Sequence, residues 1–378
     1  MKVLRTPLLA ILISIILVGC WDMVETNKRL FVGAIGVDTS KDPGKYEVSF
    51  IMPIVRKIAG GSESGGEGPR ILLVSAIADS VFDASKKMVL RQNRVMFFEH
   101  MRVFIIGEDL ARSGIEEIII PFWRRTGYNR RGIFVIAEGS AKEMLEGIPN
   151  VEKLQSYYIE GLFQNNHFSG NFFKRELGDF MHHVKASTSK GDALVSKIAL
   201  GKQKKEEVNI GGAAVIKDFR LSGWLSEEEI QGVNFCLGRM RGGNLLLEDP
   251  QSLGEASFEI SSSKKKISLV ETGENPGFVI SITTEGNIVS TTKDKRVYPE
   301  DIERLSKTAS EKIKMQAQLG IEKLQKDYRV DLIDISDYLY KYHPKLWKIY
   351  EPQWEDIFPD IKVDVKVETR IKGVGVAK

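Results

Sequence analysis

The sequence predicts a multidomain α+β protein, with an N-terminal, partly parallel α/β unit that includes an antiparallel strand pair. A C-terminal antiparallel sheet packed by a long helix follows. Strand and helix signals alternate between residues 71 and 137, a pattern typical of α/β units. Short apolar segments separated by turn residues fill 245–292, and helical periodicity follows over 302–328. The chain has 378 residues, of which 42% are hydrophobic, enough for two or three cores.

The start of the chain has the layout of a bacterial export signal with a lipid-attachment cysteine. A short basic segment precedes the apolar run 8–18, which is shorter than the roughly 20 apolar residues that a membrane-spanning helix needs. Gly19 and Cys20 follow at once, and a cysteine thiolate is a nucleophile that can accept a diacylglyceryl group. We therefore expect a signal peptide over 1–19 and a lipid on Cys20. An ordinary signal peptide with a chance cysteine is the alternative.

Charge and cysteine content narrow the classes of function. The chain has 54 basic and 51 acidic residues, a net charge of +3. Two of the basic residues lie in the signal peptide, so the mature part carries 52 against 51, or +1, which favours neither nucleic acid nor acidic substrates. Cys236 then has no partner within the chain, which excludes a disulfide scaffold and predicts a small buried hydrophobic side chain there.

An antiparallel strand pair is predicted near the start of the mature chain. The segments 30–37 and 46–54 are rich in apolar residues, and 38–44 between them holds Asp, Pro and Gly, which form turns. The stretch 60–68 contains only Gly, Ser and Glu, so it predicts a surface loop. It lacks the Gly-Lys-Ser/Thr ending of a phosphate-binding loop, and its two glutamates would repel a phosphate.

Three predicted strands then alternate with helices. The strands are 71–74, 101–106 and 133–137. We expect Asp79 to cap the first helix, Pro121 to kink or divide the second, and Ser140 with Glu143 to form a capping box on the third. A ligand site of an α/β sheet would lie in the loops after the strands, and the topological rule alone supports one here. Those loops carry Asp79, Glu108, Asp109 and Glu138.

The middle of the chain is predicted to be helical and then to approach a domain boundary. Residues 150–183 are rich in aromatic side chains and predict helix, whereas 187–208 is polar and basic. We therefore expect an N-terminal domain over 20–200, with two subdomains as one option, and a C-terminal domain over 201–378.

The C-terminal half is predicted to form a meander crossed by a helix. A hairpin with strands 213–216 and 221–225 comes first, and Ser226 and Glu229 predict a capping box. Five strands follow, at 245–247, 256–261, 266–271, 278–283 and 288–292. Pro299 suits the first turn of a long helix. Strict alternation of apolar and charged residues from Ile361 predicts a half-buried final strand.

Motifs at both ends of the chain resemble one known family. The N-terminal motifs are Gly19-Cys20-Trp21-Asp22, Gly36-Val37-Asp38 and the stretch from His100 to Ile115. The C-terminal ones are Asp331, Asp334, Pro344, Trp347, Trp354, Phe358-Pro359 and the final strand through Gly373. In their order and spacing these motifs resemble the Ger(x)C family of spore-germination lipoproteins, the C subunits of nutrient germinant receptors. Thr26 and Glu99 stand where an isoleucine and a glycine are usual.

The resemblance implies a non-enzymatic protein that acts in spore germination. It implies a lipid-anchored body on the extracytoplasmic face of the spore inner membrane, beside multipass partner subunits of the A and B types. It implies no cofactor apart from the covalent diacylglycerol on Cys20, and no nucleic-acid partner. A solute-binding lipoprotein of a membrane transporter is the alternative from another class, but it usually has two similar α/β lobes around a cleft.

The sequence contains one basic patch with aromatic residues and no recognisable catalytic motif. The patch combines Trp123-Arg124-Arg125 with Tyr128-Asn129-Arg130-Arg131, and outside a membrane it suits anionic headgroups or an acidic partner surface. A solvated charged face is the simpler interpretation. Ser-x-x-Lys occurs at 187–190 and 261–264 without the companion motifs of penicillin-recognising enzymes. The histidines, none in a His-Glu-x-x-His motif, are His100, His167, His182, His183 and His343. We therefore expect neither a catalytic nor a metal site.

Overall fold

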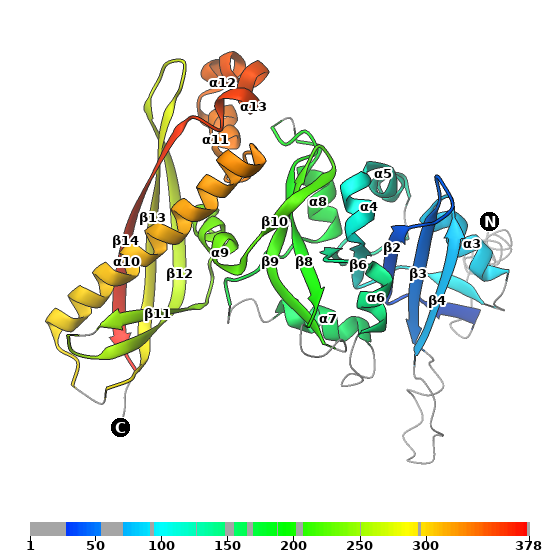
Figure 1. Ribbon diagram of the computed structural model, residues 1–378, viewed down its shortest axis with the longest axis horizontal. Coiled ribbons are helices and arrows are strands. Elements are labelled where there is room, and N and C mark those ends of the chain that lie inside the picture. The colour runs from blue at the N-terminus through cyan, green and yellow to red at the C-terminus, as the bar shows by residue number, and fades with distance from the viewer. Residues whose placement is uncertain are drawn as a thin grey trace, which may run out of the picture.

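The computed structural model describes residues 28–53, 71–90, 94–125, 127–147, 155–164, 169–186, 188–201, 207–249, 251–293 and 296–375. Within these ranges the strands form three sheets, with two, eight and four strands. Figure 1 shows the two larger sheets at opposite ends of an elongated molecule, with the long helix α10 lying along the four-stranded sheet.

The eight-stranded sheet has the order β10-β9-β8-β7-β6-β2-β3-β4. Its strands are β2 (Ala34–Thr39), β3 (Tyr46–Pro53), β4 (Ile71–Ala78), β6 (Val103–Ile106), β7 (Ile133–Ala137), β8 (Ala193–Leu200), β9 (Val208–Lys217) and β10 (Arg220–Leu225). The central strands β2, β6, β7 and β8 are parallel, and the flanking pairs are antiparallel. The predicted α/β unit and the predicted strand pair are therefore confirmed.

The apolar run of β6 shows why the centre of this sheet is parallel. Val103 and Ile105 belong to one hydrophobic cluster, whereas Phe104 and Ile106 belong to another. Since successive side chains point to opposite faces, the strand is covered on both sides, as parallel strands usually are. The covering helices are α3 (Val81–Val89), α4 (Glu108–Ser113), α5 (Glu116–Arg124), α6 (Ala141–Glu146), α7 (Gln155–Gln164) and α8 (Leu177–His183). A separate parallel pair joins β1 (Arg29–Phe31) to β5 (Val95–Phe97).

Several local predictions need correction. Ser80, not Asp79, caps α3, because its side chain accepts the backbone N–H of Asp83. The second helix divides at Gly114, whose φ of +131° favours glycine, while Pro121 stays inside α5. The described part of the segment predicted as helix over 150–183 has two short helices, α7 and α8, and is not helical over 169–176.

The strand β8 was missed altogether, because its polar and basic flanks suggested a boundary. Its sequence Ala-Leu-Val-Ser-Lys-Ile-Ala-Leu is nearly continuous in apolar character, and the strand pairs with β7 and β9 in the middle of the sheet. The predicted hairpin after residue 200 does form, as β9 and β10, but it extends the same sheet. The division into domains at residue 200 stays a prediction.

The four-stranded sheet and its helices make up the other half of the molecule. Its strands are β11 (Asn244–Asp249), β12 (Gly254–Glu271), β13 (Gly277–Thr291) and β14 (Lys362–Val374). The five predicted meander segments are thus three longer strands, with bulges where β12 bends. The final strand alternates as predicted but pairs parallel to β13, so this sheet is antiparallel apart from that pair.

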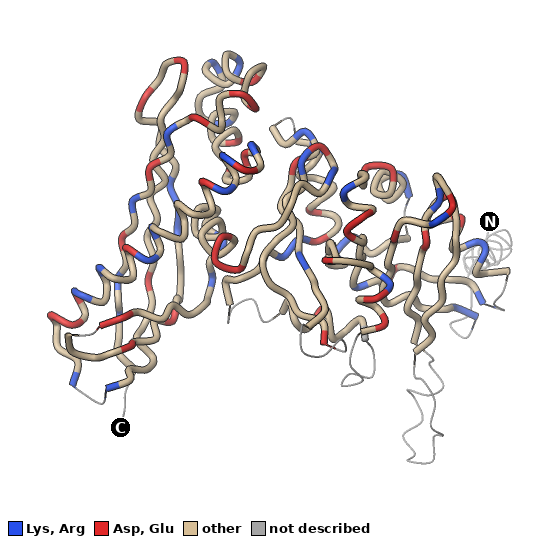
Figure 2. The backbone as a smooth tube through the Cα atoms, in the orientation of Figure 1, with Lys and Arg blue, Asp and Glu red and all other residues tan. Residues whose placement is uncertain are grey.

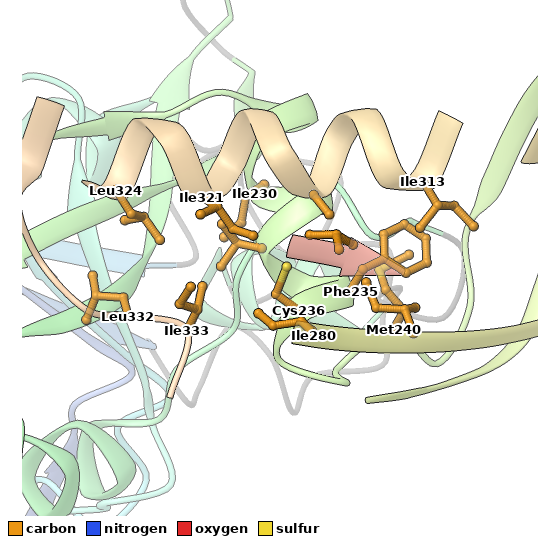
Figure 3. Packing of buried hydrophobic residues seen from close by; sticks show 14 of the residues in the cluster. Ile230, Phe235, Cys236, Met240, Ile280, Ile313, Ile321, Leu324, Leu332 and Ile333 are labelled. Atoms are coloured by element: carbon orange, nitrogen blue, oxygen red, sulfur yellow. The ribbon is translucent and has the colours of Figure 1, made fainter. Parts of the chain in front are cut away.

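The long helix α10 (Pro299–Glu322) packs on β14 and β11 and crosses α9 (Glu227–Cys236). The π-helical segment η3 (Lys323–Tyr328) continues it, and Pro299 stands at its start as predicted. The chain then forms α11 (Ile335–Tyr342), α12 (Pro344–Tyr350), η4 (Glu351–Gln353) and α13 (Trp354–Ile357). Figure 3 shows Ile313 and Ile321 of α10 against Ile230 and Phe235 of α9 in one apolar cluster.

Candidate functional site

Cys20 lies outside the described residues, which begin at Lys28. Lys28 lies eight positions after Cys20, and a fully extended chain over eight positions spans at most about 28 Å. A lipid on Cys20 would therefore hold β1, the first described strand, close to the membrane surface. Because a lipid on Cys20 is expected from the sequence, we call β1, β5 and the end of α3 the anchored end.

The anchored end combines aromatic contacts with exposed apolar side chains. The rings of Phe31 and Phe97 meet edge to face at 5.7 Å, and the Arg29 guanidinium lies 4.6 Å from the Phe97 ring centroid. Leu90, just after α3, is 87% exposed, and Val95 of β5 is 52% exposed. Two large aliphatic side chains therefore face outward from this end of the fold.

The four arginines of the basic patch are all exposed. Arg124 ends α5 and Arg125 follows it, whereas Arg130 and Arg131 lie in the loop before β7. Arg125 stacks on the Phe82 ring of α3 at 4.2 Å, and Arg130 Nη2 donates to the Trp123 carbonyl oxygen at 3.4 Å. None of the four forms an ion pair with an acidic side chain of the described chain, so their positive charge is not neutralised locally.

The aromatic residues of the patch, Trp123 and Tyr128, are partly buried and pack against the core. Tyr128 stacks on Phe98 at 4.8 Å and meets Phe122 edge to face at the same distance. Burial raises the pKa of Tyr128 well above its usual value. Because Phe98 directly follows β5, this cluster fixes the patch relative to the anchored end. The rings are not available for stacking on nucleic-acid bases, which leaves the arginines as the groups that face outward.

The loops predicted to hold a ligand site use their acidic side chains within the protein. Asp38, at the end of β2, accepts the backbone N–H groups of Ala141 at 2.7 Å and Lys142 at 2.9 Å. Asp38 thus caps α6, and burial raises its pKa although these bonds lower it. A Cβ atom on Gly107 would lie 2.0 Å from Asp38 Oδ1, so the carboxylate fills the space where β6 ends.

Two of the four predicted acidic side chains, Glu108 and Glu138, also have partners, whereas Asp79 and Asp109 are exposed. Glu108 accepts the Gly139 N–H at 3.2 Å and pairs with Arg112 at 2.7 Å. Glu138 pairs with Lys197 of β8 at 2.7 Å. The topological rule had pointed to this edge, but these carboxylates stabilise loops and a helix start. The capping role of Asp38 could not be predicted from the sequence near Ser140. It depends on how strands distant in the sequence pair, which brings the end of β2 to the start of α6.

The remaining candidate groups are dispersed. His167 and Ser187 lie outside the described residues, His100 packs against the rings of Phe31 and Phe97, and His343 bonds to Tyr338. In the described part of the chain no three His, Cys, Asp or Glu side chains gather closely enough to hold a metal ion. Cys236 is fully buried, as predicted, and burial raises the pKa of its thiol to about 12.

A polar cavity that sequence reasoning missed lies between the two halves of the fold. Its volume is about 230 Å³, and its walls include Arg175 and His183 from one half and Arg239 and Asp334 from the other. Arg175 and His183 lie more than 50 positions from Arg239 and Asp334 in the sequence, and the four residues show no common motif. Only the folded arrangement of the two sheets brings them together.

No helix of the described ranges combines the length and the apolar character needed to cross a membrane. Figure 2 shows acidic and basic residues interspersed along both halves, in agreement with the small net charge.

Comparison with known proteins identifies relatives along nearly the whole chain. Residues 22–200 match the family described as spore germination protein N-terminal domain, and 211–375 match spore germination B3/GerAC like, C-terminal. Spore germination protein YndF of Bacillus subtilis is 24% identical, over 97% of this chain and 96% of its own length. Spore germination protein B3 of the same organism is 24% identical, with 92% of each chain covered.

A solved structure has the same fold. The crystal structure of the GerBC protein superposes with a TM-score of 0.59 and 20% sequence identity, and the match covers 89% of this chain and 96% of that one. The multidomain α+β prediction is therefore confirmed. The two family models together match most of the chain, and the relatives match along nearly their whole length. These matches and the shared fold agree with the motifs at both ends of the chain. The chain belongs to the Ger(x)C family of spore-germination proteins.

Proposed function

We propose that the protein is a lipid-anchored, non-catalytic subunit of a spore nutrient germinant receptor. It acts in germination through contacts with membrane-embedded partner subunits of the A and B types. The observation that carries the proposal is the match of both family models along the chain, together with the Gly19-Cys20-Trp21-Asp22 motif at the start of the first match.

Lipid on Cys20 supplies the membrane attachment in this proposal. Each buried CH₂ of an acyl chain contributes about 0.8 kcal/mol, so the two chains of a diacylglyceryl group hold a protein stably where one would be marginal. The export signal places the body on the extracytoplasmic face. The short chain between Cys20 and β1 keeps the anchored end next to the headgroups, where Leu90 and Val95 are exposed.

The basic patch supports this orientation. Its four arginines have no acidic partners in the described chain, and each basic residue near an anionic membrane surface contributes about 1 kcal/mol of attraction. The cluster of Phe98 and Tyr128 connects the patch to β5 of the anchored end. We therefore assign Arg124, Arg125, Arg130 and Arg131 to contact with headgroups or with an acidic surface of a partner.

The chemistry of the candidate nucleophiles supports a non-catalytic role. The Cys236 thiol is enclosed in the core with a raised pKa, so it is a poor nucleophile. The solute-binding alternative predicts two similar α/β lobes, whereas the fold has one α/β sheet and one four-stranded sheet crossed by α10.

Replacing Cys20 with alanine tests the proposal. We expect Cys20→Ala to release the protein into the soluble fraction of spore lysates and to slow nutrient-triggered germination. Cys236→Ala is the matched control, because it removes the other cysteine of the chain without touching the lipid site, and it should leave membrane retention unchanged. Full germination with Cys20→Ala protein in the soluble fraction would refute the proposal.

A further inference from the structure

The cavity between the two halves of the fold contains an arginine whose charge is not compensated. Arg175 is only 6% exposed, and its Nε donates to the Leu194 carbonyl oxygen at 2.9 Å. The residue lines the cavity, and its Nη1 and Nη2 atoms form no hydrogen bond or ion pair with any described residue. Burial, and then the nearby charge of Arg239, lower the pKa of Arg175 to about 9. An arginine keeps its proton at neutral pH, so a buried cation faces the cavity.

A second guanidinium lies near the same aromatic ring, that of Phe173. Arg175 stands 5.0 Å and Arg239 stands 4.7 Å from the centroid of the Phe173 ring. Arg239 belongs to the cavity wall, and its side chain has no ion pair within the described residues. Two like charges held at one ring repel each other, and both pKa values are lowered mainly by burial. The arrangement needs a negative charge that the fold does not supply.

The carboxylates that the C-terminal half contributes to the cavity wall already have partners within the protein. Asp334 pairs with Lys265 at 2.6 Å. Asp337 accepts the Thr188 hydroxyl at 2.6 Å and pairs with Lys341 at 3.1 Å. Asp331 accepts backbone N–H groups at the start of α11, from Ile333, Ile335 and Ser336. Asp334 and the more distant Asp179 raise the pKa of Arg175 somewhat, but neither lies within ion-pair distance of it.

The remaining titratable groups of the wall do not neutralise the two arginines. Burial raises the pKa of Asp192 to about 7, so its carboxylate, which accepts the Asp218 N–H at 2.8 Å, is only partly ionised at neutral pH. Burial lowers the pKa of His183 to about 4, so its imidazole is neutral. Hence the two arginines are the cations of the cavity wall that form no ion pair with a described residue.

We propose that this cavity binds a small oxyanion, a carboxylate or a phosphate, between Arg175 and Arg239. The guanidinium group presents N–H donors in a fork that matches either anion. A volume of about 230 Å³ lies below the range of roughly 300–1,000 Å³ typical of drug-sized ligands, so the occupant has few heavy atoms.

Such a ligand would link the two halves of the chain. Arg175 is bonded to β8 of the eight-stranded sheet, whereas Arg239 follows α9, which packs against α10. An anion that bridges them adds a contact at the junction that Thr188 and Asp337 already span with a hydrogen bond. Binding to the folded state alone would also raise stability in proportion to ligand concentration. The proposal does not depend on the germination role.

The test is anion titration of the full chain in neutral detergent. Inorganic phosphate and acetate are added separately at constant ionic strength, with chloride as the reference, and thermal unfolding is followed by tryptophan fluorescence. We expect at least one of the two anions to give a saturable rise in unfolding temperature. Phosphate alone, or acetate alone, would support the proposal and define the anion class.

Arg239→Gln is the decisive variant, because this side chain makes no hydrogen bond in the described structure. We expect it to raise the dissociation constant at least about tenfold. Arg220→Gln, at an exposed position of β10 outside the cavity, is the matched control and should bind as the unmodified chain does. Arg175→Lys serves as a second probe. If Arg175→Lys fails to fold, the result with Arg239→Gln still decides the test. No saturation beyond chloride, or unchanged binding by Arg239→Gln, would overturn the proposal.

Discussion

Replacing Gly232 of α9 with alanine should destabilise the C-terminal half, although alanine is the better helix former. A Cβ atom at Gly232 would lie 1.9 Å from the carbonyl oxygen of Gln316 in α10, far closer than van der Waals contact. The neighbour is backbone, so the two helices must move apart. That movement strains the buried hydrogen bond from Gln316 Nε2 to Gln231 Oε1, which measures 2.8 Å.

The magnitude follows from two opposing effects. Alanine in a helix interior gains about 1 kcal/mol over glycine, whereas overpacking a core costs about 1–3 kcal/mol, with the upper end expected for a backbone clash. We therefore expect a net loss of about 1–2 kcal/mol. With a slope near 2 kcal/mol per molar urea, the unfolding midpoint should fall by about 0.5–1 M.

Gly161 provides the matched control. It also lies in a helix, α7, but a Cβ atom there would have no neighbour within 4 Å. Gly161→Ala should therefore leave stability unchanged or raise it by up to about 1 kcal/mol. Urea unfolding followed by circular dichroism measures both variants. A Gly232→Ala protein at least as stable as the unmodified chain would show that α9 and α10 do not cross as closely as described.

Further predictions address a cap, an ion pair and the basic patch. Ser226→Ala removes the capping box at the start of α9 and should cost about 1 kcal/mol in urea unfolding. Arg304→Gln should lower the unfolding temperature, because Arg304 bonds to the buried Asp249 at 2.7 Å and holds the pKa of that carboxyl below 3.8. Because the pKa of Asp249 is lower in the folded than in the unfolded chain, this ion pair stabilises the fold above the unfolded-state pKa, and the stabilisation is lost on acidification. The difference in unfolding temperature between Arg304→Gln and the unmodified chain should therefore shrink below about pH 4; a constant difference would contradict this. In a Cys20→Ala background, Arg124→Gln with Arg131→Gln should weaken cosedimentation with anionic vesicles, by about fivefold per charge. The control pair Lys345→Gln with Lys348→Gln lies on α12, in the other half, and should have no effect.

Elements that depend on local pattern were predicted well. The continuous apolar run of β6 follows from burial on both faces of the strand. The apolar stripe of α10 follows from burial of one helix face, and the alternation in β14 follows from burial of one strand face. The capping box at Ser226 is equally local, since its two hydrogen bonds span three residues.

Features that depend on tertiary pairing could not be predicted in the same way. The middle of β12 reads Ser-Ser-Ser-Lys-Lys-Lys, which suggests a turn, yet the strand continues there because it is paired with β13 throughout. The parallel partner of β14 lies some 80 residues earlier in the chain. Arg175 and Arg239 have no shared motif because their proximity depends on how the two sheets pack.

Purification of the full chain from detergent-solubilised spore inner membranes tests the central claim most directly. An affinity tag after Lys378 leaves the export signal and Cys20 intact. We predict that two multipass receptor subunits, of the A and B types, co-purify in fixed proportion and are identified by mass spectrometry. They should be lost from the Cys20→Ala preparation. Recovery of the chain alone, or with the membrane subunits of a solute transporter, would contradict its assignment as a receptor subunit.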